Sequence, residues 1–578
     1  MRRVAVVGGG QAGAQLALGL LAAGYQVTLV SNRTPAELRE GRVLSSQCMF
    51  ASALEAERVL GLDRWQDECP PVEGISFAVP DGAGGTAVAW AARLDAPARS
   101  VDQRLKVAWW LEQVDAAEGG RLVIEEATPA DLQRYAREHD LVVVATGKGD
   151  LARLFRPDRE KSPYDRPQRA LALTYVVGME PRPEFSAVCF NLIPEVGEYF
   201  VFPALTTTGP CEIMVFEGIP GGPMDRWDDV RTPGQHLARS LELLERFLPW
   251  EAERCRDVEL TDPNGILTGR FAPTVRRPVA ELDGVAVLGM ADAVVLNDPI
   301  TGQGSNNAAK CAETYLEAIL EREDEPFDAD WMQHTFDRYW RGYAQWVTQW
   351  TNALLAPPKP HVLGLLGAAQ ELPSLARTIA NGFDDPRIYF PWWFVPDEAE
   401  RLIEAHRRES AEARFDRRDL RQALGQFATG VTVVTTLAPD GRRVGLTANS
   451  FTSLSLEPPL LLFCLDRRAP SLPAFVDSSH FAVNVLAADQ HHLSRQFAMP
   501  AEDKFAGVDV VDGPGGVPLL EGVLARFTCR HVEHYEGGDH LIFIGEIEEY
   551  DSAGGEPLVF HSGFYRVATR HPELDAAG

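Results

Sequence analysis

A cluster of glycines near the N-terminus has the spacing that binds the phosphates of a dinucleotide. Gly8, Gly10 and Gly13 follow the short apolar run 4–7 in the pattern GxGxxG. In such a loop the first glycine allows a tight turn, the second lets the backbone approach a pyrophosphate, and the third lets a helix pack on a strand. The helix that begins here directs its unpaired N–H groups at the ligand. The pattern predicts a dinucleotide site.

The ribose of the dinucleotide lacks its usual partner. Residues 25–30 predict a second strand, which completes a βαβ unit. An acidic residue about 20 positions after the loop ordinarily binds the ribose hydroxyls. Here the strand is followed by Ser31, Asn32 and Arg33, so we expect the ribose to be held differently or more weakly.

A second glycine-rich loop lies near residue 300. Residues 285–289 predict a buried strand and residues 307–320 predict a helix. In the loop between them, Asp292 could hold the ribityl hydroxyls of a flavin, while Gly302 and Gly304 would let backbone N–H groups face its ring. Because ligands of α/β sheets lie at the carboxyl ends of strands, we expect this loop to join the site.

Two arginines are candidates for contact with an anionic cofactor. Arg42 follows the second strand, where an arginine of a flavin fold commonly reaches the cofactor, although a plain surface position is equally open. Arg99 lies in the stretch 94–105, which we expect to open a helix. Before it, residues 72–90 alternate in polarity around two glycine turns and predict a hairpin.

Length and composition favour a multidomain protein without nucleic-acid or membrane partners. The 578 residues exceed what one hydrophobic core supports, so two or three domains are expected. A net charge of −28 argues against binding to nucleic acid or an anionic membrane. The eight cysteines form no CxxC pair and no cluster at zinc spacing, so we predict a reduced, cytoplasmic protein without bound metal.

Changes in composition and in the pattern of apolar residues divide the chain into regions. We predict an α/β dinucleotide-binding region interrupted by an antiparallel, substrate-side β insertion, then a helical region whose aromatic residues are core, a solvated connecting helix, and a second domain. The second domain has an amphipathic helix and closely spaced short strands, which is typical of a small barrel. The predicted bounds are, in order, about 1–167 with 281–325, about 168–280, 326–395, 396–413 and 414–578.

Two segments of the second domain could carry chemistry. The run 447–459 is polar at positions that could line the edge of a cofactor ring. The segment Gly537–Leu541 places Asp539 and His540 at a strand start. Taken alone, the first segment could be a polar sheet face, and His540 a lone surface imidazole.

Several motifs of the chain occur together in a known family. In the N-terminal part they are Gly8–Gly13, Ala96–Asp102, Val143–Lys148 and Asp298–Asn306, and in the C-terminal part Phe427–Val433, Ala448–Ser455 and Gly538–His540. On these motifs, residues 1–395 resemble the FAD-dependent oxygenase component of styrene and indole monooxygenases, which has a Rossmann-like, hydroxybenzoate-hydroxylase-like α/β and α+β fold. Residues 414–578 resemble the flavin reductase component of the same systems, a split β-barrel. The resemblance implies a natural fusion of the two.

The resemblance also implies roles for single residues. In the N-terminal part, Arg42 and Pro299 would hold the flavin ring where the reaction occurs. Further contacts to FAD would come from Gly8, Gly10, Gly13, Arg99, Asp292, Gly302, Gly304 and Asn306. In the C-terminal part, His540 would lie near the nicotinamide of NADH, and the flavin would be surrounded by Asn449, Ser450, Ser453, Ser455 and Asp539.

Six pocket positions bear on the substrate. Styrene-preferring members of the family carry Asn, Val, His, Tyr, His and Ser there, whereas indole-preferring members carry Ser, Gln, Met, Val or Ile, Ile and Ala. This chain is of the indole type throughout, with Ser45, Gln47, Met49, Val72, Ile75 and Ala98. The alternative is that these are ordinary pocket-wall residues and that substrate choice lies elsewhere.

The implied activity is that of a self-sufficient flavin monooxygenase. NADH would reduce FAD in the C-terminal domain, and reduced FAD with O2 would form a C4a-hydroperoxide in the N-terminal domain. The products would be the epoxide of indole or, less readily, of styrene, and sulfoxides of thioethers. The protein would position the reactants and exclude water. A homodimer is expected, and weak ribose binding would favour exchange of flavin between the domains.

Three other functions are open at this point. The chain could mainly be a reductase that supplies reduced FAD to a separate styrene monooxygenase. A non-catalytic flavin-binding redox sensor would not need the nicotinamide motif of the second domain. A flavin-dependent halogenase shares the glycine loop, but Trp392–Phe394 does not supply the WxWxIP stretch that such an enzyme needs.

Overall fold

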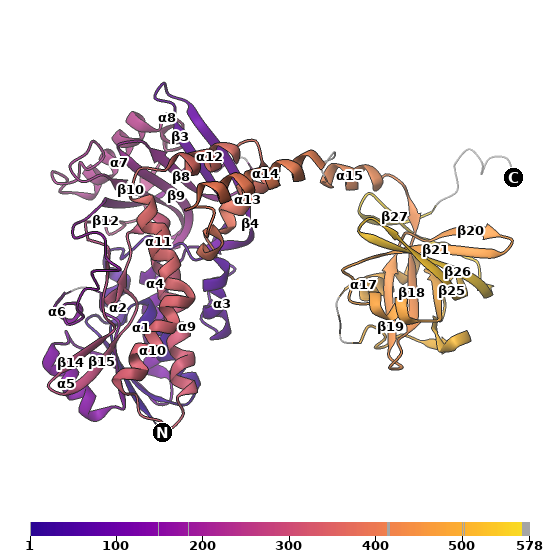
Figure 1. The fold of residues 1–578 in the computed structure, drawn as a ribbon, viewed down its shortest axis with the longest axis horizontal. Helices are drawn as coiled ribbons and strands as arrows, with labels where there is room; N and C mark the ends of the chain where they lie inside the picture. The colour runs from indigo at the N-terminus through magenta and orange to yellow at the C-terminus, as the bar shows by residue number, and fades with distance from the viewer. Residues whose placement is uncertain are drawn as a thin grey trace. The chain divides into compact units, whose positions relative to one another are not determined.

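The protein consists of two compact units, residues 1–412 and 413–578 (Figure 1). The computed structural model describes residues 2–147, 149–182, 184–412, 417–499, 501 and 503–568. Lys148 of the predicted motif and the start of the helix predicted from residue 414 lie outside these residues. In the part that is described, no helix combines the length and the apolar character needed to span a membrane.

The first sheet of unit 1 carries the glycine loop. Its strands are, in spatial order, β14 (Val279–Leu282), β15 (Val285–Gly289), β6 (Leu141–Val144), β1 (Arg3–Val7), β2 (Gln26–Ser31) and β5 (Gly120–Ile124). β1 pairs in parallel with β2 and β6, and β15 in parallel with β6. The carboxyl ends of β1, β6 and β15 therefore meet at one edge of the sheet.

Helices pack against this sheet. α1 (Gln11–Ala22) begins directly after the glycine loop and contacts α4 (Gln103–Ala116) and α9 (Gly304–Glu321), which lie beside it in Figure 1. Ala14, Leu16 and Ala17 of α1 are completely buried. The predicted βαβ unit is thus present as β1, α1 and β2. The smaller helices of this region are α2 (Pro35–Glu40), α3 (Ala51–Val59), α5 (Pro129–Glu138) and α6 (Gly149–Ala152).

A second, mostly antiparallel sheet forms the other half of unit 1. Its strands are, in spatial order, β11 (Glu259–Leu260), β7 (Ala170–Val177), β10 (Gly209–Gly218), β9 (Gly197–Thr206), β8 (Ala187–Ile193), β3 (Pro71–Pro80) and β4 (Thr86–Arg99), and β12 (Ile266–Gly269) also pairs with β7. The predicted hairpin over residues 72–90 is confirmed, and as β3 and β4 it joins this sheet.

The helix expected to open over residues 94–105 begins later. Residues 94–99 belong to β4, because Ala98 and Arg99 pair with Val72 and Pro71 of β3. α4 starts only at Gln103, where the Asp102 carboxylate accepts the backbone N–H of Arg104 at 2.8 Å. The cross-strand pairing therefore decided the conformation of a stretch whose local sequence favoured a helix.

The second sheet is covered on both faces. Along β10, Ile213 and Val215 belong to one hydrophobic cluster, and Met214 and Phe216 belong to another. Because side chains alternate along a strand, these clusters lie on opposite faces. α7 (Pro233–Phe247) contributes to one face, and α8 (Pro249–Arg254) follows it.

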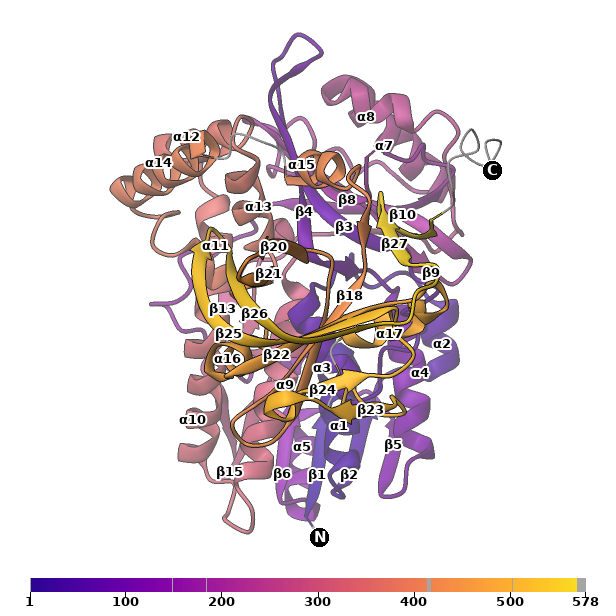
Figure 2. The ribbon, with the colours of Figure 1, turned by 90° about the vertical axis from the view of Figure 1, so that its right-hand side faces the viewer.

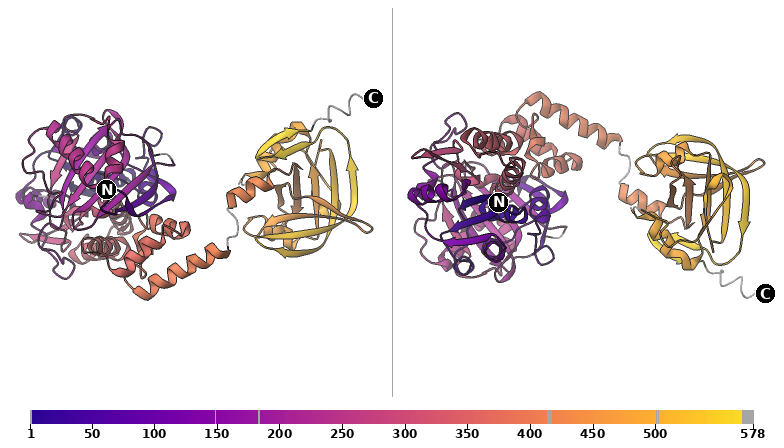
Figure 3. Two further views of the ribbon diagram at one scale, coloured as in Figure 1. Left: turned by 90° about the horizontal axis from the view of Figure 1, so that it is seen from above. Right: turned by 90° about the horizontal axis from the view of Figure 1, so that it is seen from below.

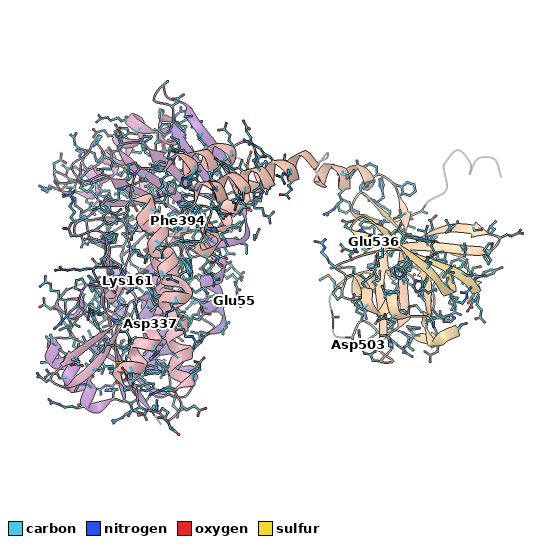
Figure 4. All side chains as sticks on the ribbon, viewed as in Figure 1. Glu55, Lys161, Asp337, Phe394, Asp503 and Glu536 are labelled. Atoms are coloured by element: carbon cyan, nitrogen blue, oxygen red, sulfur yellow. The ribbon has the colours of Figure 1, made fainter. Side chains whose placement is uncertain are left out.

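The other face is covered by the aromatic-rich helical region. The helices on this face are α11 (Gln345–Leu354), α12 (Pro360–Ala368), α13 (Pro373–Asn381) and α14 (Pro396–Glu412). Before them, α10 (Ala329–Tyr339) packs on α9 and the first sheet, and a π-helical turn at Trp340–Ala344 follows it. Trp350 stacks on Tyr389 with ring centroids 4.4 Å apart, and Phe394, labelled in Figure 4, stacks on Phe390 at 4.5 Å. The prediction that these aromatics form core is confirmed.

The connecting helix is less solvated than expected. α14 contacts α12 and α13, and Ala399 near its N-terminus is 1% exposed. Leu402 and Ile403 pack on the same aromatic cluster. The first turns of this charged helix are therefore part of unit 1, because small and apolar residues recur on one side of it.

Unit 2 is built on a curled sheet of seven strands. They are, in spatial order, β19 (Arg443–Ala448), β18 (Thr432–Leu437), β22 (His480–Val485), β25 (Ala525–Gly537), β26 (His540–Ser552), β21 (Pro459–Asp466) and β20 (Thr452–Leu456). β25 and β26 form the long, curved hairpin seen in Figure 2. The sheet curls until β19 approaches β21, and Figure 3 shows the strands wrapped around an interior. Phe463, Phe475 and Phe543 fill that interior.

Smaller elements complete unit 2. They are α15 (Arg417–Leu424), α16 (Leu472–Asp477), α17 (His491–Ala498), a sheet of β17 (Thr429–Gly430), β27 (Leu558–His561) and β28 (Phe564–Val567), and the pair β23 (Val510–Asp512) and β24 (Pro518–Leu520). Each of the eight cysteines of the chain is a free thiol, and seven of them are buried.

Candidate functional site

The turn between β1 and α1 forms an open cradle. Gly8 has φ +127°, and a Cβ on Gly13 would stand 2.0 Å from the Gly8 carbonyl oxygen, so the turn closes only with glycine at both positions. A Cβ on Gly10, by contrast, would meet nothing within 4 Å. The first N–H groups of α1 have no partner within the helix and face this space. The cradle therefore fits a pyrophosphate.

The three strand ends of the first sheet meet at this cradle. A Cβ on Gly8 would lie 2.8 Å from the carbonyl carbon of Ala145, which follows β6. A Cβ on Gly147 would lie 2.4 Å from Cβ of Asp292, which follows β15. The parallel pairing thus brings the predicted residues Gly8 and Asp292, which are far apart in the sequence, to one edge of the sheet.

The region after β2 contributes two arginines and one glutamate to a single cavity. The Ser31 hydroxyl donates to the carbonyl of Arg33 at 2.8 Å, which turns the chain away from the sheet. Arg33 and Arg42 line one cavity of about 440 Å³. Arg42 is exposed and forms no ion pair with a described residue. An anionic group in this cavity would meet two guanidinium groups and also the carboxylate of Glu37, which lines the same space.

The 298–304 loop forms a second open cradle, at the start of α9. It contains a 3₁₀ turn over Pro299–Thr301, which is capped because the Asp298 carboxylate accepts the backbone N–H of Ile300 at 3.2 Å. Gly302 has φ +65°, and a Cβ on Gly302 or Gly304 would meet nothing within 4 Å. Space is therefore open beside both glycines, but the N–H of Gly302 donates to the carbonyl of Pro299 at 2.7 Å and is not available to a ligand.

Asn306 lies behind this loop, and the hydrogen-bonding groups of its side chain are occupied by backbone partners. Its Nδ2 donates to the carbonyl of Cys48 at 2.9 Å, and its Oδ1 accepts the backbone N–H of Phe50 at 2.8 Å. Asn306 is 1% exposed. The amide thus ties α9 to residues 48–50, and its contribution to the site is to position them.

Two of the six predicted substrate residues belong to a buried hydrogen-bond chain. The Ser45 hydroxyl donates to Oε1 of Gln47 at 3.0 Å, and Nε2 of Gln47 donates to the Tyr175 hydroxyl at 3.3 Å. Tyr175 in turn donates to the Ser45 carbonyl at 2.8 Å. Burial raises the pKa of Tyr175 well above its ordinary value, so the hydroxyl stays protonated. Tyr175 is a residue that the sequence did not reveal.

The other four substrate residues divide between two clusters. Val72 and Ala98 pair across β3 and β4 and share a hydrophobic cluster with Ile75. Met49 lies in another cluster with Ala53 and Ala309. Its Sδ accepts from Nε2 of Gln11 at 3.3 Å and from Nζ of Lys106 at 3.0 Å.

An apolar pocket lies between the 298–304 loop and the second sheet. Two small cavities, of about 40 and 30 Å³, share Phe190, Ile300 and Phe383. Of the six predicted substrate residues only Ile75 lines one of these cavities, the first, whereas the predicted flavin contacts Pro299 and Gly302 line the second. A cavity that admits benzene measures roughly 150 Å³, so aromatic side chains must move before a substrate enters. The strands β8–β10 contribute further lining residues that sequence reasoning missed, Phe200, Phe202 and Val215.

Arg99 faces a different cavity from the one that Arg42 lines. It lines about 360 Å³ of space beside α3, together with Lys106. Lys106 is 3% exposed and pairs with Glu57 at 2.7 Å. Burial raises the pKa of Glu57, although the Lys106 ammonium opposes this.

In unit 2 the predicted polar run lies at the edge of the sheet. Ser450 fixes it to β21, because its hydroxyl donates to the carbonyl of Cys464 at 3.2 Å and accepts the N–H of the same residue at 2.9 Å. Asn449 and Ser453 are exposed, and Ser455 is half-buried. Three of the four side chains are therefore available to a ligand.

His540 lies at the end of the same group of strands. In the sheet, β21 separates β20 from β26, and Asp466 of β21 pairs with His540 of β26. Nδ1 of His540 lies 2.8 Å from Oδ1 of Asp539, and this hydrogen bond lowers the pKa of Asp539. The imidazole remains 42% exposed, so its outer nitrogen can reach a ligand.

Comparison with known proteins covers both units. Residues 147–254 match the family described as "Styrene monooxygenase A putative substrate binding domain", and residues 424–569 match the "Flavin reductase like domain". Styrene monooxygenase StyA of Pseudomonas fluorescens is 30% identical over 398 residues, 67% of this chain and 93% of that protein.

The reductase relatives cover the remainder. The FMN reductase (NADH) SmoA of Agrobacterium fabrum is 43% identical over 26% of this chain and 84% of its own length. The stachydrine N-demethylase reductase subunit Stc3 of Rhizobium meliloti is 44% identical over 26% of this chain and 66% of its own length. The chain therefore belongs to the styrene monooxygenase family, as an oxygenase fused to a flavin reductase domain.

Proposed function

We propose that unit 2 reduces FAD with NADH and that unit 1 uses the reduced FAD and O2 to oxygenate a small aromatic substrate. The observation that carries the proposal is the presence in one chain of an oxygenase and a flavin reductase. When bound, reduced FAD supplies the electrons that activate O2. The protein itself is then required to bind and orient the flavin and the substrate and to exclude water.

The open cradles of unit 1 support FAD as its ligand. The N–H groups after Gly10 would bind the pyrophosphate, and Arg42 would approach the cofactor from the cavity beside β2. Pro299 and the open glycines of the 298–304 loop would lie against the ring. Since β2 is followed directly by Ser31, Asn32 and Arg33 and not by an acid, we propose that the adenosine ribose is held weakly enough for flavin to exchange between the units.

The pocket supports indole as the preferred substrate. Ile75, Phe190 and Ile300 offer apolar walls to a bicyclic ring. Oε1 of Gln47 accepts one hydrogen bond from Ser45 and has a second lone pair, but Gln47 is 1% exposed and lines neither cavity, so an indole N–H would reach it only after pocket side chains move. Styrene lacks this donor. We propose epoxidation of the indole 2,3-bond, with styrene epoxidation and thioether sulfoxidation as slower reactions.

The exposed histidine of unit 2 supports a nicotinamide site beside the flavin. His540, oriented by Asp539, would contact the nicotinamide, and Asn449, Ser453 and Ser455 would contact the flavin. Leu456, Tyr550 and Phe564 of this unit are exposed by 87%, 75% and 64%. A homodimer that covers such residues is part of the proposal.

The test uses the purified full chain with NADH, FAD, air and either indole or styrene, and no added reductase. We expect oxygenated products from both substrates, with indole converted faster. His540→Ala should slow product formation by about tenfold or more, and chemically reduced FAD should restore it. NADH consumption that yields only hydrogen peroxide would leave a reductase that supplies reduced FAD to a separate monooxygenase, and would contradict the proposal.

A further inference from the structure

Four buried ionisable side chains meet behind the 298–304 loop. Arg169 precedes β7, Glu198 lies on β9, Glu217 lies on β10, and Asp298 begins the loop. They are 9%, 2%, 0% and 3% exposed, in that order. Glu198 and Glu217 are cross-strand partners, and all four side chains interact electrostatically. None of the contacts described above involves Glu217.

This cluster has one positive charge for three carboxyl groups. Arg169 donates two hydrogen bonds to Glu198, from Nε at 2.6 Å and from Nη2 at 2.9 Å, which neutralises that carboxylate. Both carboxyl oxygens of Glu217 are buried without a donor among the described residues. The Glu217 carboxyl group instead lies in hydrogen-bond contact with that of Asp298.

Two carboxyl groups in such contact do not both stay ionised. Burial, followed by the neighbouring Asp298 and Glu198, raises the pKa of Glu217 well above its ordinary value. Burial also raises the pKa of Asp298, to about 6. The nearby Tyr164 hydroxyl donates to the carbonyl of Asn352, so it does not supply the missing donor. A proton on one of the two carboxyl groups supplies this hydrogen-bond donor.

We infer that Glu217 and Asp298 share one proton and that the resulting hydrogen bond holds the 298–304 loop against β10. Because Asp298 also caps the turn at Ile300, a displaced Asp298 carboxyl group would move Pro299 and Gly302. The two acids are thus positioning residues for the loop. The inference rests on the proposed function only for the identity of the ligand, the flavin ring, that this loop meets.

The sign of the pH dependence follows from the shared proton. When the loop opens, water reaches the pair, and its carboxyl groups titrate near their ordinary pKa of about 4. Between that value and the raised pKa of the closed pair, the closed loop holds a proton that the open loop releases. The closed loop is therefore favoured at the acid end of this window and becomes less favoured as the pH rises, by up to about tenfold per pH unit.

Hydrogen exchange of the full chain without flavin tests the inference directly. After correction for intrinsic rates, the amides of residues 300–304 should lose protection between about pH 5 and 7 by up to about tenfold per unit. Glu217→Gln places a permanent donor beside Asp298, so protection should become independent of pH. Asp298→Asn keeps the oxygen that caps Ile300 and should behave in the same way, which covers the case that one variant fails to fold. Glu217→Leu removes the donor and should lower protection at every pH.

Glu245→Gln serves as the matched control, because Glu245 is an exposed carboxylate on α7, and it should retain the pH dependence of the unaltered chain. Protection that stays constant from pH 5 to 8 in the unaltered chain would overturn the inference. The same applies if Glu217→Gln and Asp298→Asn keep its pH dependence.

A parallel FAD titration separates this inference from the proposed function. All 12 tryptophans lie in unit 1, so quenching of their fluorescence reports binding to that unit. FAD affinity should weaken with rising pH in step with loop protection, and Glu217→Gln should remove the dependence. Loop protection could depend on pH through the Glu217–Asp298 pair while FAD affinity does not. That result would uphold the shared proton and refute the placement of the flavin at this loop.

Discussion

A pair of alanine substitutions in the glycine loop separates folding from ligand binding. A Cβ at Gly13 would stand 2.0 Å from the Gly8 carbonyl oxygen, whereas real Cβ contacts stay beyond 3.0 Å. In Gly13→Ala, the start of α1 must therefore move by about 1 Å from a backbone atom that cannot rotate away. Overpacking of this kind costs about 1–3 kcal/mol. Unit 1 should lose that stability even without flavin.

Gly10→Ala should have the opposite outcome. Gly10 has φ −86° and ψ −175°, which any residue adopts, and its Cβ would meet no protein atom within 4 Å. Stability should stay the same or rise by about 0.5 kcal/mol, because alanine restricts the unfolded chain. The methyl group would occupy the space proposed for the pyrophosphate. Loss of one charge-assisted hydrogen bond, about 1.5–3 kcal/mol, should weaken FAD binding by roughly 10- to 100-fold.

Both effects can be measured on the full chain. Because all 12 tryptophans belong to unit 1, their fluorescence follows denaturant unfolding of unit 1 and its FAD binding without interference from unit 2. NADH oxidation, a property of unit 2, is the internal control and should be unchanged in both variants. If Gly10→Ala bound FAD as tightly as the unaltered chain, the open space beside Gly10 would not be the phosphate site.

Three further predictions concern single side chains. His540→Ala should slow NADH oxidation by about tenfold or more, equivalent to ~1.4 kcal/mol in the barrier, without lowering the melting temperature, because the imidazole is 42% exposed; an unchanged rate would remove it from the nicotinamide site. Asn306→Ala leaves the carbonyl of Cys48 and the N–H of Phe50 unpaired, so unit 1 should lose about 2–4 kcal/mol in tryptophan-monitored unfolding; a loss below 1 kcal/mol would contradict the positioning role. Lys106→Met isolates the buried Glu57 carboxylate and should cost about 3–5 kcal/mol at pH 7; the cost should shrink at pH 5, where the raised pKa of Glu57 favours its neutral form, and the double variant with Glu57→Gln should recover most of it.

The ligand loops were readable in the sequence because their constraints are local. The spacing of Gly8, Gly10 and Gly13 specifies a turn and a helix start within six residues, and Gly302 permits the left-handed conformation that the 298–304 loop adopts. Elements with a strong local pattern, such as the βαβ unit and the hairpin of β3 and β4, were predicted for the same reason. The placement of the two ligand loops side by side could also be predicted from the sequence, since parallel strands present their carboxyl ends at one edge of the sheet.

The rest depended on contacts between distant segments. Residues 94–99 became strand because β3 pairs with them, and α14 became partly buried because α12 and α13 offered an apolar surface. Asn306 looked like a ligand of the cofactor, yet its amide is consumed by backbone groups more than 250 positions away in sequence.

The same holds for the chemistry behind the 298–304 loop. Arg169, Glu198, Glu217 and Asp298 are ordinary charged residues in the sequence, on four separate segments. Only the packing of β7, β9 and β10 against the loop removes them from water and leaves three carboxyl groups with one cation. Burial and proximity set the protonation of these groups, and both are properties of the tertiary structure.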